Sequence, residues 1–80
     1  MNKSKVEEVV LGIFKKDTGR QDTNSAYYLF TDLDLDSLDV VEIVMEIEDT
    51  LDISIDGDMF DNCNTINDII DIAFDLVKDK

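Results

Sequence analysis

Apolar residues recur at every third or fourth position in three stretches of the chain, which is the spacing of one face of a helix. In the first stretch the apolar residues are Val6, Val9, Val10, Ile13 and Phe14. Ser4-Lys5-Val6-Glu7 has the form of a capping box, and Lys15 and Lys16 suit the negative end of a helix. Gly19 lies just beyond them. We therefore expect a first helix from Ser4 to Lys16.

Two apolar stripes follow the stretch from Leu38 to Leu51, which contains neither Gly nor Pro. One has the spacing of a core-facing side and consists of Val40, Ile43, Val44, Ile47 and Leu51. The other, here named the outer strip, consists of Leu38, Val41 and Met45 and lies nearly opposite, because each residue turns a helix by about 100°. A helix in a small bundle buries one side, so we expect the outer strip to be exposed and bordered by carboxylates. The alternative is that residues of the preceding loop cover it.

The remaining segments predict a last helix, a short helix and a long connection. Thr65 can cap a last helix whose apolar residues are Ile66, Ile69, Ile70, Ala73, Phe74 and Val77. A short helical piece fits around Asp58–Asn62, and residues 17–36 form a connection that is long for a compact domain. The predicted fold class is all-α. We expect a small four-helix bundle of three main helices plus one short helix, with a long first loop, in a single domain spanning residues 1–80.

The chain is strongly acidic, with 20 Asp and Glu against 7 Lys and Arg and a formal net charge of −13. Nucleic acids and anionic membranes bind basic surfaces, so this balance argues against both as partners. The basic residues all lie near the two ends, and residues 21–77 contain 16 acids and no Lys or Arg. We expect this stretch to be unable to neutralise itself and to attract basic protein surfaces or cations.

The composition also limits the chemistry that the chain can perform. There is no His, which is the commonest general base, and the single Cys63 can form neither an internal disulfide nor a zinc cluster. The N-terminal residues lack an apolar leader, and no apolar run approaches membrane-spanning length. We expect a cytoplasmic, monomeric, non-catalytic protein without membrane insertion, in which Cys63 is a small, partly buried thiol.

A serine motif stands at the start of the two-sided helix, where Asp36 and Ser37 are both candidates for the N-cap. Taken alone, Asp36-Ser37-Leu38-Asp39 indicates only a capped helix start. Together with the flanking residues, this tetrapeptide forms a longer pattern from Asp32 to Met45, which is Asp-Leu-x-x-Asp-Ser-Leu-Asp-x-Val-Glu-Ile-Val-Met. This pattern closely resembles the acyl carrier proteins of dissociated (type II) fatty acid and polyketide synthesis, and the similarity is dense from Leu29 to Asp56.

The resemblance implies a specific role for Ser37. In that family the motif serine carries a 4′-phosphopantetheine arm through a phosphodiester, and the thiol of the arm holds an acyl chain as a thioester. A phosphopantetheinyl transferase adds the arm, and acyl-transferring and condensing enzymes with basic docking surfaces bind the helix after the serine. Asp36 flanks the attachment site. The resemblance and the acidic border together place Leu38, Asp39, Val41, Glu42, Met45, Glu46, Glu48 and Asp49 in partner recognition.

The chain departs from the family pattern at Asp34, because members usually have Gly three residues before the serine. Asp adopts left-handed backbone conformations more readily than most other residues, so the same turn can form here. The departure bears on which pathway the chain serves more than on the carrier role itself.

Other functions remain open on the sequence alone. A carrier of aminoacyl or peptidyl groups, or of D-alanine, would use Ser37 in the same way. A calcium site is another alternative, because Asp32-x-Asp34-x-Asp36 resembles the opening of an EF-hand loop, although the closing carboxylate is missing. A third alternative is an acidic protein that binds divalent cations weakly or that mimics nucleic acid in an interaction.

Overall fold

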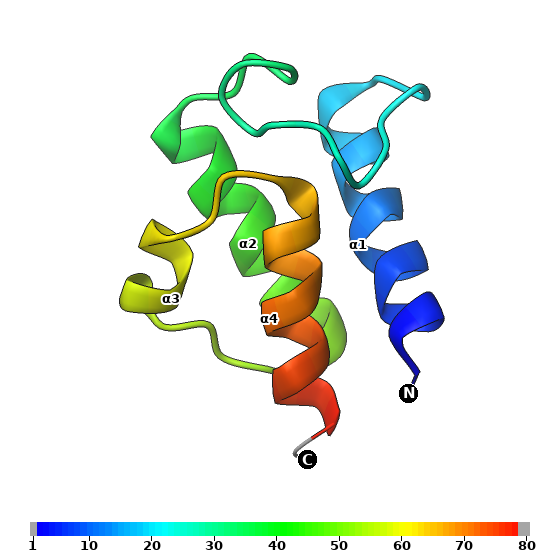
Figure 1. The fold of residues 1–80 in the computed structure, drawn as a ribbon, viewed down its shortest axis with the longest axis vertical. Helices are drawn as coiled ribbons and strands as arrows, with labels where there is room; N and C mark the ends of the chain where they lie inside the picture. The colour runs from blue at the N-terminus through cyan, green and yellow to red at the C-terminus, as the bar shows by residue number, and fades with distance from the viewer. Residues whose placement is uncertain (1, 79–80) are drawn as a thin grey trace.

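The computed structural model describes residues 2–78, in which four helices are joined by loops (Figure 1). The helices are α1 (Lys3–Thr18), α2 (Ser37–Leu51), α3 (Gly57–Asp61) and α4 (Ile66–Lys78). α1 packs against both α2 and α4, and the short α3 lies to the left of α4 in Figure 1. No strand occurs within residues 2–78, so the predicted all-α fold of three main helices and one short helix is confirmed.

Asn2, and not Ser4, caps the start of α1. The Oδ1 atom of Asn2 accepts a hydrogen bond from the Lys5 N–H at 2.9 Å. The expected capping box from Ser4 to Glu7 was therefore wrong. Asn is as good an N-cap residue as Ser, and a cap at Asn2 lets the helix begin at Lys3, which places Ser4 inside the first turn.

The end of α1 lies at Thr18, slightly beyond the expected Lys16. The Thr18 hydroxyl donates to the Phe14 carbonyl at 2.7 Å and so extends the last turn. Gly19 then leaves the helix with a φ of 72° and donates its N–H to the Lys15 carbonyl. This left-handed conformation favours glycine because glycine has no Cβ atom.

The core consists mainly of the predicted apolar stripes, together with two leucines of the first loop and Cys63. All five residues of the core-facing stripe of α2 are buried. Leu29 and Leu33 of the loop are 0% and 5% exposed, so this connection packs onto the helices as its composition predicted. Within the described range, no helix has the length and apolar character needed to cross a membrane.

Arg20 organises the first half of the long loop. Its guanidinium donates to the Asp32 carbonyl at 2.6 Å, pairs with the Asp22 carboxylate at 3.5 Å and lies over the ring of Tyr27. The Tyr27 hydroxyl also donates to Asp22 at 3.3 Å. One side chain therefore links both ends of the loop, although the sequence alone assigned no role to Arg20.

Backbone hydrogen bonds join the second half of the loop to the start of α4. Tyr28 and Thr65 form an isolated antiparallel bridge, flanked by a bond from the Leu29 N–H to the Asn64 carbonyl at 2.9 Å. The Asn67 N–H donates to the Ser25 carbonyl at 2.8 Å. The loop therefore crosses the end of the bundle in a defined position and presents the segment that leads into α2.

A reciprocal cap begins α4. The Thr65 hydroxyl oxygen accepts from the Asp68 N–H at 3.2 Å, as predicted, and Asp68 Oδ2 accepts from the N–H groups of Asn64 and Thr65. These backbone hydrogen bonds lower the pKa of the Asp68 carboxyl. The stability that they provide is present above the unfolded-state pKa of Asp68 and is lost as the pH falls through the lower folded-state pKa.

The same substitution should have opposite effects at two glycines, one inside α1 and one just after its end. Gly12→Ala should raise the free energy of unfolding by about 0.5–1 kcal/mol, because Gly12 lies inside the helix and an added Cβ meets nothing within 4 Å. Gly19→Ala should lower it by about 1 kcal/mol, because the positive φ at Gly19 strains any residue with a Cβ. Urea denaturation followed by circular dichroism measures both, and equal effects would contradict the assigned end of α1.

Candidate functional site

Asp36 caps α2 and leaves Ser37 free. The Asp36 Oδ1 atom accepts from the Asp39 N–H at 2.9 Å, and the Asp39 carboxylate accepts from the Asp36 N–H at 3.2 Å, which completes a capping box. Ser37 is the first helical residue and is exposed. Its hydroxyl forms no hydrogen bond with any residue in the described range. Of the two candidate caps, the structure therefore selects Asp36.

A left-handed turn at Asp34 directs the chain into α2. Asp34 has a φ of 56°, which lies in the left-handed region that favours glycine. The residues on both sides hold this turn, because Leu33 is buried and the Leu35 N–H donates to the Leu29 carbonyl at 3.2 Å. The expectation that Asp replaces Gly without losing the turn is confirmed.

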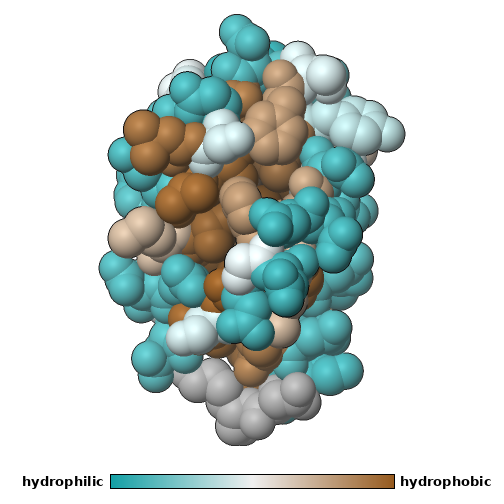
Figure 2. All heavy atoms as spheres, turned by 90° about the vertical axis from the view of Figure 1, so that its left-hand side faces the viewer, coloured by the Kyte–Doolittle hydropathy of each residue, from teal (hydrophilic) through white to brown (hydrophobic). Residues whose placement is uncertain are grey.

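The outer strip of α2 is exposed. Leu38, Val41 and Met45 are 65%, 40% and 57% exposed, whereas the opposite stripe is buried. The alternative that loop residues cover the outer strip was therefore wrong. Figure 2 shows the side of the molecule that α3 and the start of α2 reach in Figure 1, where apolar side chains gather between hydrophilic margins.

Three of the five carboxylates assigned to partner recognition have partners inside the chain. Asp39 belongs to the capping box, Glu46 pairs with Lys16 of α1 at 2.9 Å, and Glu48 Oε2 accepts from the Ile55 N–H at 2.7 Å. Glu42 and Asp49 are exposed and have no ion pair or hydrogen bond through their side chains within residues 2–78. The acidic border therefore divides into structural carboxylates and two unengaged ones.

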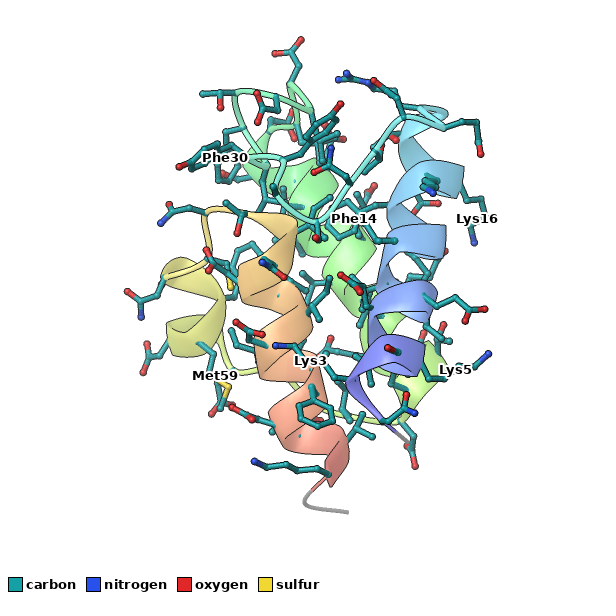
Figure 3. The ribbon with its side chains drawn as sticks, turned by 45° about the vertical axis from the view of Figure 1, so that its right-hand side comes forward. Lys3, Lys5, Phe14, Lys16, Phe30 and Met59 are labelled. Atoms are coloured by element: carbon teal, nitrogen blue, oxygen red, sulfur yellow. The ribbon has the colours of Figure 1, made fainter. Side chains whose placement is uncertain are left out.

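Residues 21–77 contain no Lys or Arg, but basic residues outside this stretch reach into it and pair with some of its acids. Lys16 reaches Glu46, and Lys3 pairs with Asp71 of α4 at 2.7 Å; Figure 3 labels both lysines on α1. The pKa of each lysine is raised, chiefly by the side-chain hydrogen bond to its carboxylate. The chain order did not reveal these pairs, because they depend on how α1 packs against α2 and α4.

Two grooves adjoin α2. A polar groove of about 520 Å³ lies between α1, the first loop and α2, and carboxylates of Asp39, Glu42 and Glu46 line it with Arg20. A smaller groove of about 170 Å³ lies between α2 and the α3 region. Its lining is mostly apolar and consists of Val41, Val44, Met45, Glu48, Ile55, Gly57 and Phe60. Only the smaller groove has the chemistry to receive a hydrocarbon chain.

The aspartates that resembled an EF-hand opening hold the local backbone instead. The Asp32 carboxylate accepts from the Tyr28 N–H at 2.8 Å, Asp34 forms the left-handed turn, and Asp36 caps α2. Among the described residues, no three or more side chains of His, Cys, Asp or Glu are placed to hold a metal ion. The geometry does not favour the calcium alternative.

Comparison with known proteins identifies the family. The family described as "Phosphopantetheine attachment site" matches residues 4–73, which is most of the chain. The chain therefore belongs to this family, and its cofactor is phosphopantetheine. The resemblance seen in the serine motif is confirmed.

Its relatives include proteins named acyl carrier protein. One from Cyanophora paradoxa is 36% identical over 61 residues, which cover 76% of this chain and 59% of that protein. One from Streptococcus pyogenes serotype M3 is 36% identical over 66 residues, which cover 82% of each chain. A third, from Exiguobacterium sibiricum, is 44% identical over 39 residues, or 49% of each chain.

Charge reversal should separate the structural carboxylates from the unengaged ones. Glu48→Lys should lower the free energy of unfolding by about 1 kcal/mol, because the Ile55 N–H loses its acceptor. Glu42→Lys and Asp49→Lys should change it by less than about 0.5 kcal/mol. Thermal and urea denaturation measure all three variants. Equal stability of Glu48→Lys and Glu42→Lys would contradict the assignment of Glu48.

Cys63 should be unreactive in the folded protein. The thiol is buried, and burial together with the nearby Asp68 charge raises its pKa to about 11. Alkylation by iodoacetamide at pH 8 should therefore be much slower in the native protein than in urea, since the thiolate is the nucleophile. The native rate should rise as the pH approaches that pKa. Equal rates in the native and unfolded protein at pH 8 would contradict the burial of this side chain.

Proposed function

We propose that the chain carries acyl intermediates as thioesters on a 4′-phosphopantetheine arm attached to Ser37. The arm supplies the thiol that holds the acyl group, and the protein presents it to successive enzymes of fatty acid or related polyketide or lipid biosynthesis. The single observation that carries the proposal is the exposed, unbonded Ser37 hydroxyl at the start of α2 in a member of the phosphopantetheine family. The relatives named acyl carrier protein support acyl groups as the cargo.

The start of α2 provides a suitable environment for a phosphodiester on Ser37. The capping box occupies the N–H groups of Asp36 and Asp39, while those of Ser37 and Leu38 remain without a partner among the described residues. Unpaired N–H groups and the positive end of the helix dipole favour an anion at this position. The Asp36 carboxylate opposes the anion but keeps the serine hydroxyl free, because it provides the cap.

The apolar groove beside the outer strip is the proposed shelter for the acyl chain. Val41 and Met45 belong to both the strip and the groove, so a chain leaving Ser37 along α2 meets a continuous apolar path. α3 forms the opposite wall and contributes no fully buried residue, so little packing opposes its displacement by a longer chain. Polar residues dominate the larger groove, which makes it unsuitable for a hydrocarbon chain.

Partner enzymes are proposed to dock on the outer strip through basic surfaces. These partners are a phosphopantetheinyl transferase and the acyl-transferring or condensing enzymes of the pathway. Glu42 and Asp49 are the carboxylates available for pairing, since the other three have internal roles. Charge attraction raises the rate of encounter more than the lifetime of a complex, which suits a carrier that must leave each enzyme.

The nature of the cargo can be tested separately from the attachment. Carriers of aminoacyl groups or D-alanine would use the same serine, so loading by an acyl–carrier synthetase and by an adenylating amino acid ligase distinguishes these classes. We expect acyl loading only. Loading by the amino acid ligase alone would replace the acyl proposal with the aminoacyl alternative.

Ser37→Ala should abolish modification. Incubation of the wild-type protein with coenzyme A and a broad-specificity phosphopantetheinyl transferase should add the mass of one phosphopantetheine group, as measured by intact mass spectrometry. Ser37→Ala should gain nothing and should melt like the wild type, because Ser37 is not the cap. Ser4→Ala is the matched control, since Ser4 is also an exposed serine in the first turn of a helix. Modification of Ser37→Ala would disprove the attachment site.

A further inference from the structure

Two aromatic side chains in the first loop remain exposed and lie outside the core. Tyr28 and Phe30 are 54% and 45% exposed, although they flank Leu29, which is completely buried. The backbone of Tyr28 holds the loop through its bridge to Thr65 and its bond to Asp32. Its hydroxyl has no partner within the described residues. The fold therefore holds this segment through its main chain and Leu29, and leaves about half of each ring exposed.

The neighbouring Tyr27 provides a direct contrast. Its ring lies under the Arg20 guanidinium and its hydroxyl donates to Asp22, so this aromatic side chain stabilises the loop. Tyr28 and Phe30 instead line an open, mostly apolar hollow of about 150 Å³ with Thr31 and Asn64. A hollow with two exposed aromatic walls is the type of surface that protein interfaces use, because aromatic rings bury a large area at low entropic cost.

The two rings and the outer strip belong to the same small set of exposed apolar side chains. The exposed large apolar side chains within residues 2–78 come from this loop, from the outer strip and from α3, and they are Tyr28, Phe30, Leu38, Val41, Met45 and Met59. In Figure 3, Phe30 and Met59 lie on the same side of the molecule. Figure 2 shows apolar side chains over this region, with hydrophilic residues on both margins.

We propose that Tyr28 and Phe30 form a second docking element, in addition to the outer strip, that packs against an apolar surface with a basic rim on the phosphopantetheinyl transferase. This inference rests on the proposed carrier function. The transferase must place its active site at Ser37, so it covers the start of α2 and the loop that leads into it. Because three of the five carboxylates on α2 are engaged internally, apolar contacts carry a larger share of the affinity.

Charge complementarity favours this partner over other occupants. Residues 21–77 contain 16 acids and no Lys or Arg, so a surface that covers the loop and α2 needs basic groups around its apolar centre. A second copy of the chain has the same net charge of −13 and is repelled. An anionic membrane is repelled for the same reason.

The test compares the kinetics of phosphopantetheine transfer for matched variants. Tyr28→Ser/Phe30→Ser should raise the KM of the transferase for the carrier by about five- to tenfold, with kcat unchanged, because the rings contribute to binding and not to the chemistry. Phe30→Leu should behave like the wild type, since it keeps an apolar side chain. Gln21→Ser, a truncation at an exposed position elsewhere in the loop, is the control.

Thermal denaturation separates docking from folding. The double variant should melt like the wild type, whereas Tyr27→Ser should melt lower because it loses the contacts with Arg20 and Asp22. If the double variant is unfolded, Phe30→Asn alone replaces it in the kinetic comparison. An increased KM in a folded variant supports the proposal.

Several outcomes would overturn the proposal. A KM equal to that of the wild type, or an equal increase for Gln21→Ser, would reject the docking role of the rings while leaving the carrier function intact. A dimer that dissociates in the double variant, or binding of the wild type to neutral phosphatidylcholine vesicles, would assign the patch to another occupant. Failure of the wild type to gain mass would reject the carrier function, and the docking proposal with it.

Discussion

The capping box between Asp36 and Asp39 is the interaction on which the candidate site depends. Its two carboxylates accept from the N–H groups of Asp36 and Asp39 at the start of α2, so the serine between them is not needed as the cap. If Ser37 had been the cap, its hydroxyl would be committed to the N–H of a later residue in the first turn. Neighbouring residues therefore have separate roles: the aspartates cap the helix, and the serine exposes its hydroxyl oxygen to solvent.

A similar separation between structural and exposed side chains extends along α2. One side of the helix is buried against the bundle, and the other combines an apolar strip with carboxylates that serve either the fold or the solvent. Lys16 and the Ile55 N–H each engage one of these carboxylates and fix α1 and the α2–α3 connection relative to α2. A highly acidic chain thus uses part of its charge to position its own elements and keeps the remainder available at the surface.

The sequence predicted the helices and the two-sided character of α2 because helical periodicity depends on local spacing alone. The serine motif likewise lies within one continuous segment. The cap at Asn2 was missed because Ser4 matched a competing local pattern with equally good chemistry. The roles of Lys16, Arg20 and Glu48 could not be predicted, because Lys16 meets its partner only through helix packing and the other two depend on how a loop folds back. Tyr28 and Phe30 stand on either side of the apolar Leu29, and this alternation was the one signal in the sequence that the two rings are exposed.

The burial of Cys63 has a consequence for the proposed carrier, which would hold its cargo on sulfur. Its thiol is almost entirely protonated at neutral pH, since its pKa lies near 11, and its side chain packs in the core. In the proposed carrier, this sulfur therefore neither intercepts a thioester from the arm nor closes a disulfide with it. In the proposed carrier, the thiol of the arm is therefore the one thiol that can readily exchange an acyl group at neutral pH.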